Sequence, residues 1–260
     1  MTVRRFMAGL LAPIYCLGAA SLAFAVWNAA AADERTIRFG IPIEGYPPYL
    51  MNKDKALLGI VGDAFVAISN SIGYKTELII VPEKRLDHMS ERGQLDAVAG
   101  AIEWEDDAQK YTWTEGIIKV SDNVVMTKAH DTMSVTVDDL KGKHVALMLG
   151  YTYPSLEGLI KTGSFRSTRL RHFVGLLRVV DAGRVDYGIL DQNVANWIIR
   201  EKKLKLANNL RFSQPGFDEV FYRIVLYPPK DWSAFVTSFN GALATFKMNG
   251  DLDKILDKYR

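Results

Sequence analysis

A run of acidic side chains is the stretch of this 260-residue chain with the most evident chemical potential. Four carboxylates lie within five positions, in the order Glu103, Trp104, Glu105, Asp106 and Asp107. Such a run could bind a cation. It fits a solvated helix start equally well, because acidic residues favour the first turn of a helix. Both interpretations stay open on the sequence alone.

Aromatic residues form a second candidate site. Tyr46 and Tyr49 flank two prolines in a rigid loop, and a tyrosine ring can stack on a ligand or a cation. The alternative is a surface loop packed by its own aromatic rings. Tyr151, Tyr153 and Trp104 are further candidates, although aromatic side chains more often pack than bind ligands.

Two polar residues lie next to predicted strand ends. Thr152 comes just after Gly150 at a predicted helix start, where free N–H groups, the helix dipole and a hydroxyl favour an anion. Asp191 follows the predicted strand 185–190, and ligands in open α/β sheets bind at the carboxyl ends of strands. Either residue could instead cap the helix that follows it.

Composition narrows the classes of function. The chain has 48% hydrophobic and 24% charged residues, as ordinary globular proteins do. Its histidines lack the spacing of a metal motif, and neither a Gly-x-Ser-x-Gly segment nor a phosphate-binding glycine loop is present. We therefore expect no metal and no cofactor. The histidines are His88, His130, His144 and His172.

The first 32 residues have the pattern of a secretory signal peptide. Arg4 and Arg5 precede an uncharged stretch over 6–27, and the Ala-rich end at 28–32 offers a cleavage site before Asp33. One alternative is a retained membrane anchor, because 22 uncharged residues can span a bilayer. Cleavage after Ala25 is another.

Removal of residues 1–32 changes the charge and the cysteine content. Lys and Arg fall from 32 to 30, which equals the 30 Asp and Glu residues. A neutral mature chain argues against a nucleic-acid partner. The single cysteine, Cys16, is removed as well, so the mature chain forms no disulfide. Because Tyr15 precedes it, where a lipoprotein signal has a small residue, we expect no lipid anchor.

A short repeat indicates two lobes of similar construction. The segment 93–96 (Gly-Gln-Leu-Asp) returns ninety residues later at 183–186 (Gly-Arg-Val-Asp), each time after a helix-like run and before an apolar run. Glycine ends a helix well because it adopts the left-handed conformation of the C′ position. Strands that alternate with helices of ten to fifteen residues indicate βαβ units and a largely parallel sheet.

The predicted elements fill most of the chain after residue 35. Strands are predicted over 36–41, 75–81, 97–101, 120–127, 144–149, 169–172, 185–190, 211–212 and 221–226, and helices over 60–72, 82–92, 174–182, 192–201 and twice within 232–260. A short helix is also expected near 135–140, and another after 150–154.

Several segments together resemble family 3 periplasmic solute-binding proteins of the amino-acid-binding type. They are Tyr-Pro-Pro-Tyr at 46–49, Gly-Ile-Val-Gly-Asp at 59–63, Pro-Glu-Lys-Arg at 82–85, Phe-Asn-Gly-Ala-Leu at 239–243, Asn-Gly at 249–250 and Lys-Tyr at 258–259. The resemblance covers residues 35–260 and implies an α/β fold of the type II periplasmic-binding-protein kind, with two lobes that close on a ligand. Lobe 1 would be residues 33–120 plus 213–260, and lobe 2 residues 121–212. Extended crossings near 119–122 and 209–213 would form the hinge.

The resemblance also implies roles for individual residues, with one departure. In the family, the position of Thr152 contacts the ligand carboxylate, that of Asp191 pairs with the ligand amino group, and that of Tyr49 forms an aromatic wall. The family arginine that grips the carboxylate is missing, because Asp107 stands in its place. Arg85 is the best substitute, since the helix after Pro82 should point at the cleft. We expect a small polar ligand that is amino-acid-like or amine-bearing.

The resemblance thus implies a monomeric periplasmic binding protein that captures a small solute for an ABC transporter, without chemistry on the solute. One alternative is an enzyme similar to cyclohexadienyl dehydratases, in which the acidic run at 103–107 would supply a carboxylate acid. Another is a sensor that presents its closed form to a membrane receptor.

Overall fold

The computed structural model describes residues 35–82, 85–129, 134–206 and 210–259. The predicted signal peptide, with its cleavage site and Cys16, lies outside these residues, as does His130. No helix in the described part of the chain is both long enough and apolar enough to span a membrane.

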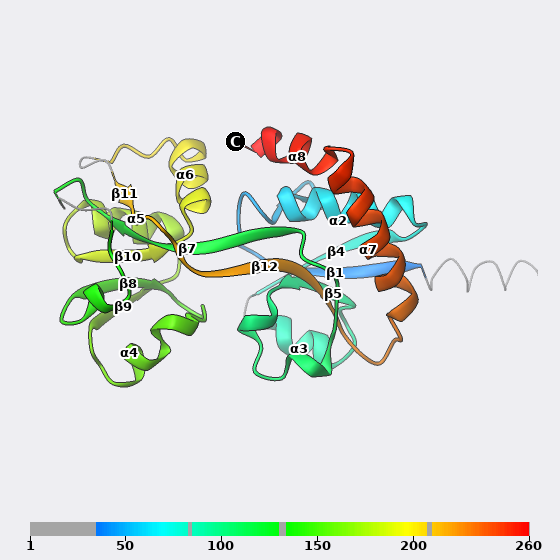
Figure 1. Cartoon of the computed structure of the whole chain (residues 1–260), viewed down its shortest axis with the longest axis horizontal. Helices are drawn as coiled ribbons and strands as arrows, with labels where there is room; N and C mark the ends of the chain where they lie inside the picture. Colours follow the sequence, from blue (N-terminus) through cyan, green and yellow to red (C-terminus); the bar gives the residue numbers. More distant parts are fainter. Residues whose placement is uncertain (1–34, 83–84, 130–133, 207–209, 260) are drawn as a thin grey trace, which may run out of the picture. The chain divides into compact units, whose positions relative to one another are not determined.

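The chain alternates strands and helices, as the sequence predicts (Figure 1). The strands are β1 (Thr36–Pro42), β2 (Met51–Lys53), β3 (Ala56–Leu58), β4 (Lys75–Val81), β5 (Ala97–Gly100), β6 (Thr112–Trp113), β7 (Ile118–Met126), β8 (His144–Met148), β9 (Arg166–Leu170), β10 (Tyr187–Leu190), β11 (Arg211–Phe212) and β12 (Phe217–Leu226). The helices are α2 (Ile60–Ser71), α3 (Leu86–Glu91), α4 (Glu157–Lys161), α5 (Phe173–Asp181), α6 (Gln192–Glu201), α7 (Ser233–Met248) and α8 (Asp251–Tyr259). The hairpin of β2 and β3 was not predicted, because each strand has only three residues.

The principal sheet has the strand order β4-β1-β5-β12-β7-β10-β8-β9. Parallel pairs join β1 to β5, β8 to β9 and β10 to β8, as βαβ units require. The pairs that involve the two long strands β7 and β12 are antiparallel. The strands β4, β1 and β5 therefore lie on one side of the β12–β7 pair in the sheet order, and β10, β8 and β9 lie on the other.

The two long strands connect these two sets of strands. Phe217 of β12 lies opposite Asp122 of β7, and Tyr222 lies opposite Ile118 (Figure 1). Residues 119–122, where one crossing was expected, belong to β7. Within the second expected crossing, Arg211 pairs with Met126 at the far end of β7.

The repeated glycine ends a helix, and the repeated aspartate binds a neighbouring strand, in both copies of the repeat. Gly93 and Gly183 have φ of 65° and 61°, and each follows the end of a helix. The carboxylate of Asp96 accepts a hydrogen bond from the N–H of Arg38, and that of Asp186 accepts one from the N–H of His144. In each copy, the aspartate thus ties its strand to the neighbouring parallel strand.

The C-terminal helices close the core over β1 and α2. Phe235 and Phe239 of α7 are buried against Phe65 of α2, with ring centroids 6.5 and 5.8 Å away. Tyr259 at the end of α8 donates its hydroxyl to Asp63 and accepts the N–H of Gly59. Three of the segments that carried the family resemblance, at 59–63, 239–243 and 258–259, therefore meet at α2.

Candidate functional site

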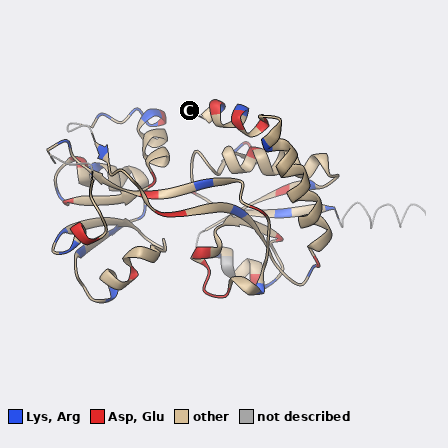
Figure 2. Ribbon diagram, in the orientation of Figure 1, with Lys and Arg blue, Asp and Glu red and all other residues tan. Residues whose placement is uncertain are grey.

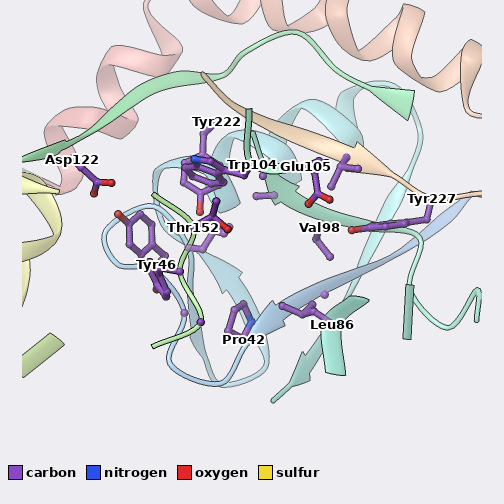
Figure 3. Close-up of a pocket in the computed structure, with 18 residues that line it drawn as sticks. Pro42, Tyr46, Leu86, Val98, Trp104, Glu105, Asp122, Thr152, Tyr222 and Tyr227 are labelled. Carbon is purple, nitrogen blue, oxygen red and sulfur yellow. The ribbon is translucent and has the colours of Figure 1, made fainter. Parts of the chain in front are cut away.

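A cavity of about 330 Å³ lies beside the β12–β7 pair (Figure 3). Its volume is in the range of small-molecule sites. The lining comes from chain segments far apart in the sequence: Gly40, Pro42, Gly45, Tyr46, Leu50, Leu86, Val98, Ala99, Gly100, Trp104, Glu105, Asp122, Gly150, Tyr151, Thr152, Tyr222, Val225 and Tyr227. This cavity is the candidate ligand site.

Aromatic rings make a continuous wall of the cavity. The ring of Trp104 meets that of Tyr222 edge to face at 90°, with centroids 5.4 Å apart. Tyr46 lies 6.1 Å from Tyr222 and 6.0 Å from Tyr151. Such packing fixes the rings against one another, so their faces are already in place before a ligand arrives.

The charged residues that line the described cavity are both acidic. They are Glu105, which follows the short turn Ile102–Trp104, and Asp122 on β7. No Lys, Arg or His belongs to the lining within the described ranges. Figure 2 shows acidic positions on both long strands, β7 and β12. The charged side chains that reach the cavity from the described residues are therefore carboxylates.

Asp122 is a lining carboxylate for which the described residues offer no partner. Side chains alternate along a strand, so Asp122 faces the cavity while Asn123 turns away and accepts the N–H of Gln192. Neither a hydrogen bond nor an ion pair reaches the Asp122 carboxylate from the residues that the structure describes. Burial, followed by the nearby charges of Asp191 and Asp218, raises the pKa of Asp122 to about 7. An unpaired buried carboxylate is unfavourable, and such groups gather at functional sites.

Asp191 lies behind the aromatic wall and is buried. One carboxylate oxygen caps α6 by accepting the N–H groups of Asn193 and Val194 at 2.7 and 3.0 Å. The other oxygen accepts the hydroxyl of Tyr49 at 3.0 Å, and the Asn193 amide donates to the same hydroxyl. Burial raises the pKa of Asp191 despite these hydrogen bonds. The helix-capping role weighed from the sequence is confirmed.

Two replacements of Asp191 distinguish the effect of its helix cap on stability from the effect of its charge. Asp191→Ala removes the cap and should lower the free energy of unfolding by about 1–2 kcal/mol. Asp191→Asn keeps a side-chain oxygen in place and should change it by less than about 0.5 kcal/mol. Urea unfolding of the two variants measures the difference, and equal losses would contradict a capping role.

Five of the residues singled out from the sequence line the cavity: Tyr46, Trp104, Glu105, Tyr151 and Thr152. Tyr49 and Tyr153 are buried behind it instead. The hydroxyl of Tyr153 accepts the N–H of Met148 at 2.9 Å, which anchors the segment that presents Tyr151 and Thr152.

The helix expected to begin at Thr152 starts later. Gly150 has a φ of 90°, residues 151–153 belong to no helix or strand, and the first helical turn begins at Pro154. No side chain caps that turn. Thr152 is therefore neither a helix cap nor at a helix terminus, and its exposed hydroxyl reaches the cavity from a loop.

Neither Asp107 of the acidic run nor Arg85, the expected substitute for the family arginine, lines the cavity. Asp107 is exposed, forms an ion pair with Lys110 and is not part of the lining. This pairing lowers the pKa of Asp107. Arg85 is exposed at the start of α3, next to Leu86, which does line the cavity. Of the run, Trp104 and Glu105 reach the site.

Asp122, Tyr222 and Tyr227 were missed by the sequence analysis. The extended run 120–127 was predicted as a strand, but Asp122 is flanked there by Ser121 and Asn123 and does not stand out. Its position opposite Phe217 depends on strand pairing between residues almost one hundred positions apart, which no local pattern reveals.

The sequence matches one protein-family model and one curated relative. Residues 37–260 match the model for bacterial extracellular solute-binding proteins, family 3. A probable amino-acid-binding protein of Bacillus subtilis (strain 168), YxeM, is 25% identical over 237 residues, with 89% of this chain and 86% of that protein covered.

Solved structures share the fold at low identity. A mutant of ArgBP from T. maritima matches with a TM-score of 0.69 and 18% identity, over 89% of this chain and 97% of that chain. The ancestral amino acid-binding protein AncCDT-1, a precursor of cyclohexadienyl dehydratase, matches with a TM-score of 0.68 and 17% identity, over 89% of this chain and 98% of that chain. The predicted two-lobed type II α/β fold is confirmed.

Proposed function

Because the chain belongs to family 3 of the bacterial extracellular solute-binding proteins, it binds a small solute, and we propose that this solute carries a positively charged amine. The bound ammonium would lie beside Asp122 in the cavity between β7, β5 and the Tyr151–Thr152 loop.

The observation that carries this proposal is the unpaired carboxylate of Asp122 in a cavity whose charged lining is acidic. An ammonium group would give Asp122 the partner it lacks and offset the repulsion from Asp191 and Asp218. A ligand carboxylate would find no cationic partner among the described lining residues. Binding of an ordinary anionic amino acid is therefore disfavoured.

The aromatic wall supports the same ligand charge. The faces of Trp104 and Tyr222 carry the negative part of the ring quadrupole and attract a cation. Trp104→Leu should weaken binding of a cationic ligand about tenfold, since a desolvated cation–π contact contributes on the order of 1–2 kcal/mol. Trp104→Phe keeps a ring and should lose less. Calorimetric titration of both variants checks this, and equal losses would argue against a role for the ring.

Family membership supports our assignment of the two lobes and of the cellular role. We assign residues 33–120 plus 213–260 to one lobe and 121–212 to the other, with closure by bending of β7 and β12. Residues 1–32 would direct export and be cleaved, which mass spectrometry of the secreted protein would test.

The liganded monomer would then deliver its solute to an ABC permease. A sensory role would instead require a membrane receptor, and a receptor kinase gene beside this one would favour it.

A dehydratase is the second candidate, because one observation favours it. Asp122 has a pKa of about 7, which suits a general acid near neutral pH. Against it, prephenate carries two carboxylates, and the described lining offers them no cation. Incubation with prephenate or arogenate decides: unchanged substrate fits a binding protein, and conversion would establish an enzyme.

A thermal-shift screen over amines, polyamines, amino acids and small acids tests the proposed ligand class. We expect the largest shifts from cations and none from dicarboxylic acids. Arg85→Ala serves as a control, because Arg85 is exposed and outside the lining. A carboxylate ligand that binds the native protein and is lost in this variant would overturn the proposal.

A further inference from the structure

The two carboxylates of the cavity lie at different ends of it. In Figure 3, Asp122 lies beside Tyr46 at one end, whereas Glu105 lies near Val98, toward Tyr227, at the other. The chain gives a reason for the separation. Asp122 comes from the long strand β7, and Glu105 follows the turn after β5.

The space between the two carboxylates has an apolar wall. Figure 3 shows Trp104 and Tyr222 between Asp122 and Glu105. Leu86, Val98, Val225 and Pro42 also belong to the lining. A methylene chain of a ligand could pack against these rings and aliphatic groups. Burial of each methylene contributes about 0.8 kcal/mol.

We propose that the cavity takes a small organic dication of the aliphatic diamine class, with one ammonium group beside Asp122 and the second beside Glu105. The hydrocarbon between the two ammonium groups lies along Trp104 and Tyr222. This inference rests on the proposed function and goes further, because it fixes the number and placement of the ligand charges.

The two ends do not contribute equally. Asp122 and Glu105 are both half-buried. No described residue pairs with the Asp122 carboxylate, so Asp122 gains most from an ammonium group. Glu105 already has interactions within the protein, so it gains less from a second ammonium group. We therefore expect Asp122 to govern binding of any amine, and Glu105 to govern the preference for a second charge.

Calorimetric titration of the full-length mature protein with 1,4-diaminobutane and n-butylamine at pH 8 tests the inference. These probes share a four-carbon chain and differ in the number of ammonium groups. We expect the diamine to bind about tenfold or more tightly than the monoamine. Glu105→Gln should remove most of this preference and leave the monoamine affinity within about twofold, whereas Asp122→Asn should weaken both probes.

Asp106→Asn is the matched control, since Asp106 is exposed beside Glu105 and outside the lining. It should leave both affinities and their ratio unchanged. The ratio in the native protein decides even if a variant fails to fold. Equal binding of the two amines would overturn the inference and leave the proposed function standing. No binding of either amine, together with binding of a zwitterionic or anionic amino acid, would overturn both.

Discussion

Asp122→Asn is expected to stabilise the unliganded protein while it weakens the binding of organic cations. The two effects share a cause, because no described residue pairs with this carboxylate and the charges of Asp191 and Asp218 lie near it. An amide of the same shape removes the unfavourable charge. It also removes the counter-ion that a bound ammonium would use. Opposite effects on stability and affinity are typical of functional residues.

The size of the stability effect follows from the pKa of Asp122. Folding raises that pKa from 3.8 to about 7, and one pKa unit corresponds to about 1.4 kcal/mol. The ionised carboxylate therefore lowers the free energy of unfolding by up to about 4 kcal/mol. Because the folded pKa lies above the unfolded one, this loss is absent below pH 4, grows between pH 4 and 7, and is complete above pH 7.

Urea unfolding of the native protein and Asp122→Asn at pH 4 and pH 8 measures this effect. We expect the variant to be more stable at pH 8 and equal at pH 4. Its affinity for 1,4-diaminobutane at pH 8 should fall at least about tenfold. Asp106→Asn, at an exposed position, should change neither quantity. A variant that is less stable at pH 8, or that binds the diamine unchanged, would contradict the role given to Asp122.

Affinity for a cationic solute should fall as the pH is lowered from 8 to 6. A proton and an ammonium group compete for the same carboxylate, so protonation of Asp122 around pH 7 makes the apparent dissociation constant about tenfold larger at pH 6 than at pH 8. An aliphatic amine stays charged over this range, because ammonium pKa values lie near 10.

The titratable groups that face Asp122 do not reverse the expected fall in affinity at lower pH. Asp191 and Asp218 are acidic, and the pKa values of Tyr46 and Tyr153 are raised by burial, so both tyrosines stay neutral at pH 6–8. Titrations at half-unit pH steps measure the dependence. In Asp122→Asn the tenfold slope should disappear. A flat profile in the native protein, or an unchanged slope in the variant, would show that another group carries the dependence.

Local patterns predicted the elements of the fold well, because they depend on residues close in sequence. The apolar spacing of 60–72 predicted α2. The repeated glycine and aspartate predicted two similar helix-to-strand turns, at Gly93 and at Gly183. The periodicity of 232–260 became α7 and α8, separated at Asn249 and Gly250. The antiparallel pairing of β7 with β12 could not be foreseen, since it depends on contacts between distant segments.

The site was predicted only in part, for the same physical reason. Tyr46, Trp104, Tyr151 and Thr152 lie in loops whose composition marks them, and they meet at the cavity. Asp122 reaches the cavity through the pairing of β7 with β12, and such pairing is a tertiary property that local sequence does not encode.

The cavity should select a positively charged solute, because its described charged lining consists of carboxylates. Calorimetric titration of the mature protein at pH 8 with 1,4-diaminobutane and with succinate compares a dication and a dianion built on four carbons. We expect saturable binding of the diamine and no heat of binding from succinate. Saturable binding of succinate, with none of the diamine, would contradict this selectivity.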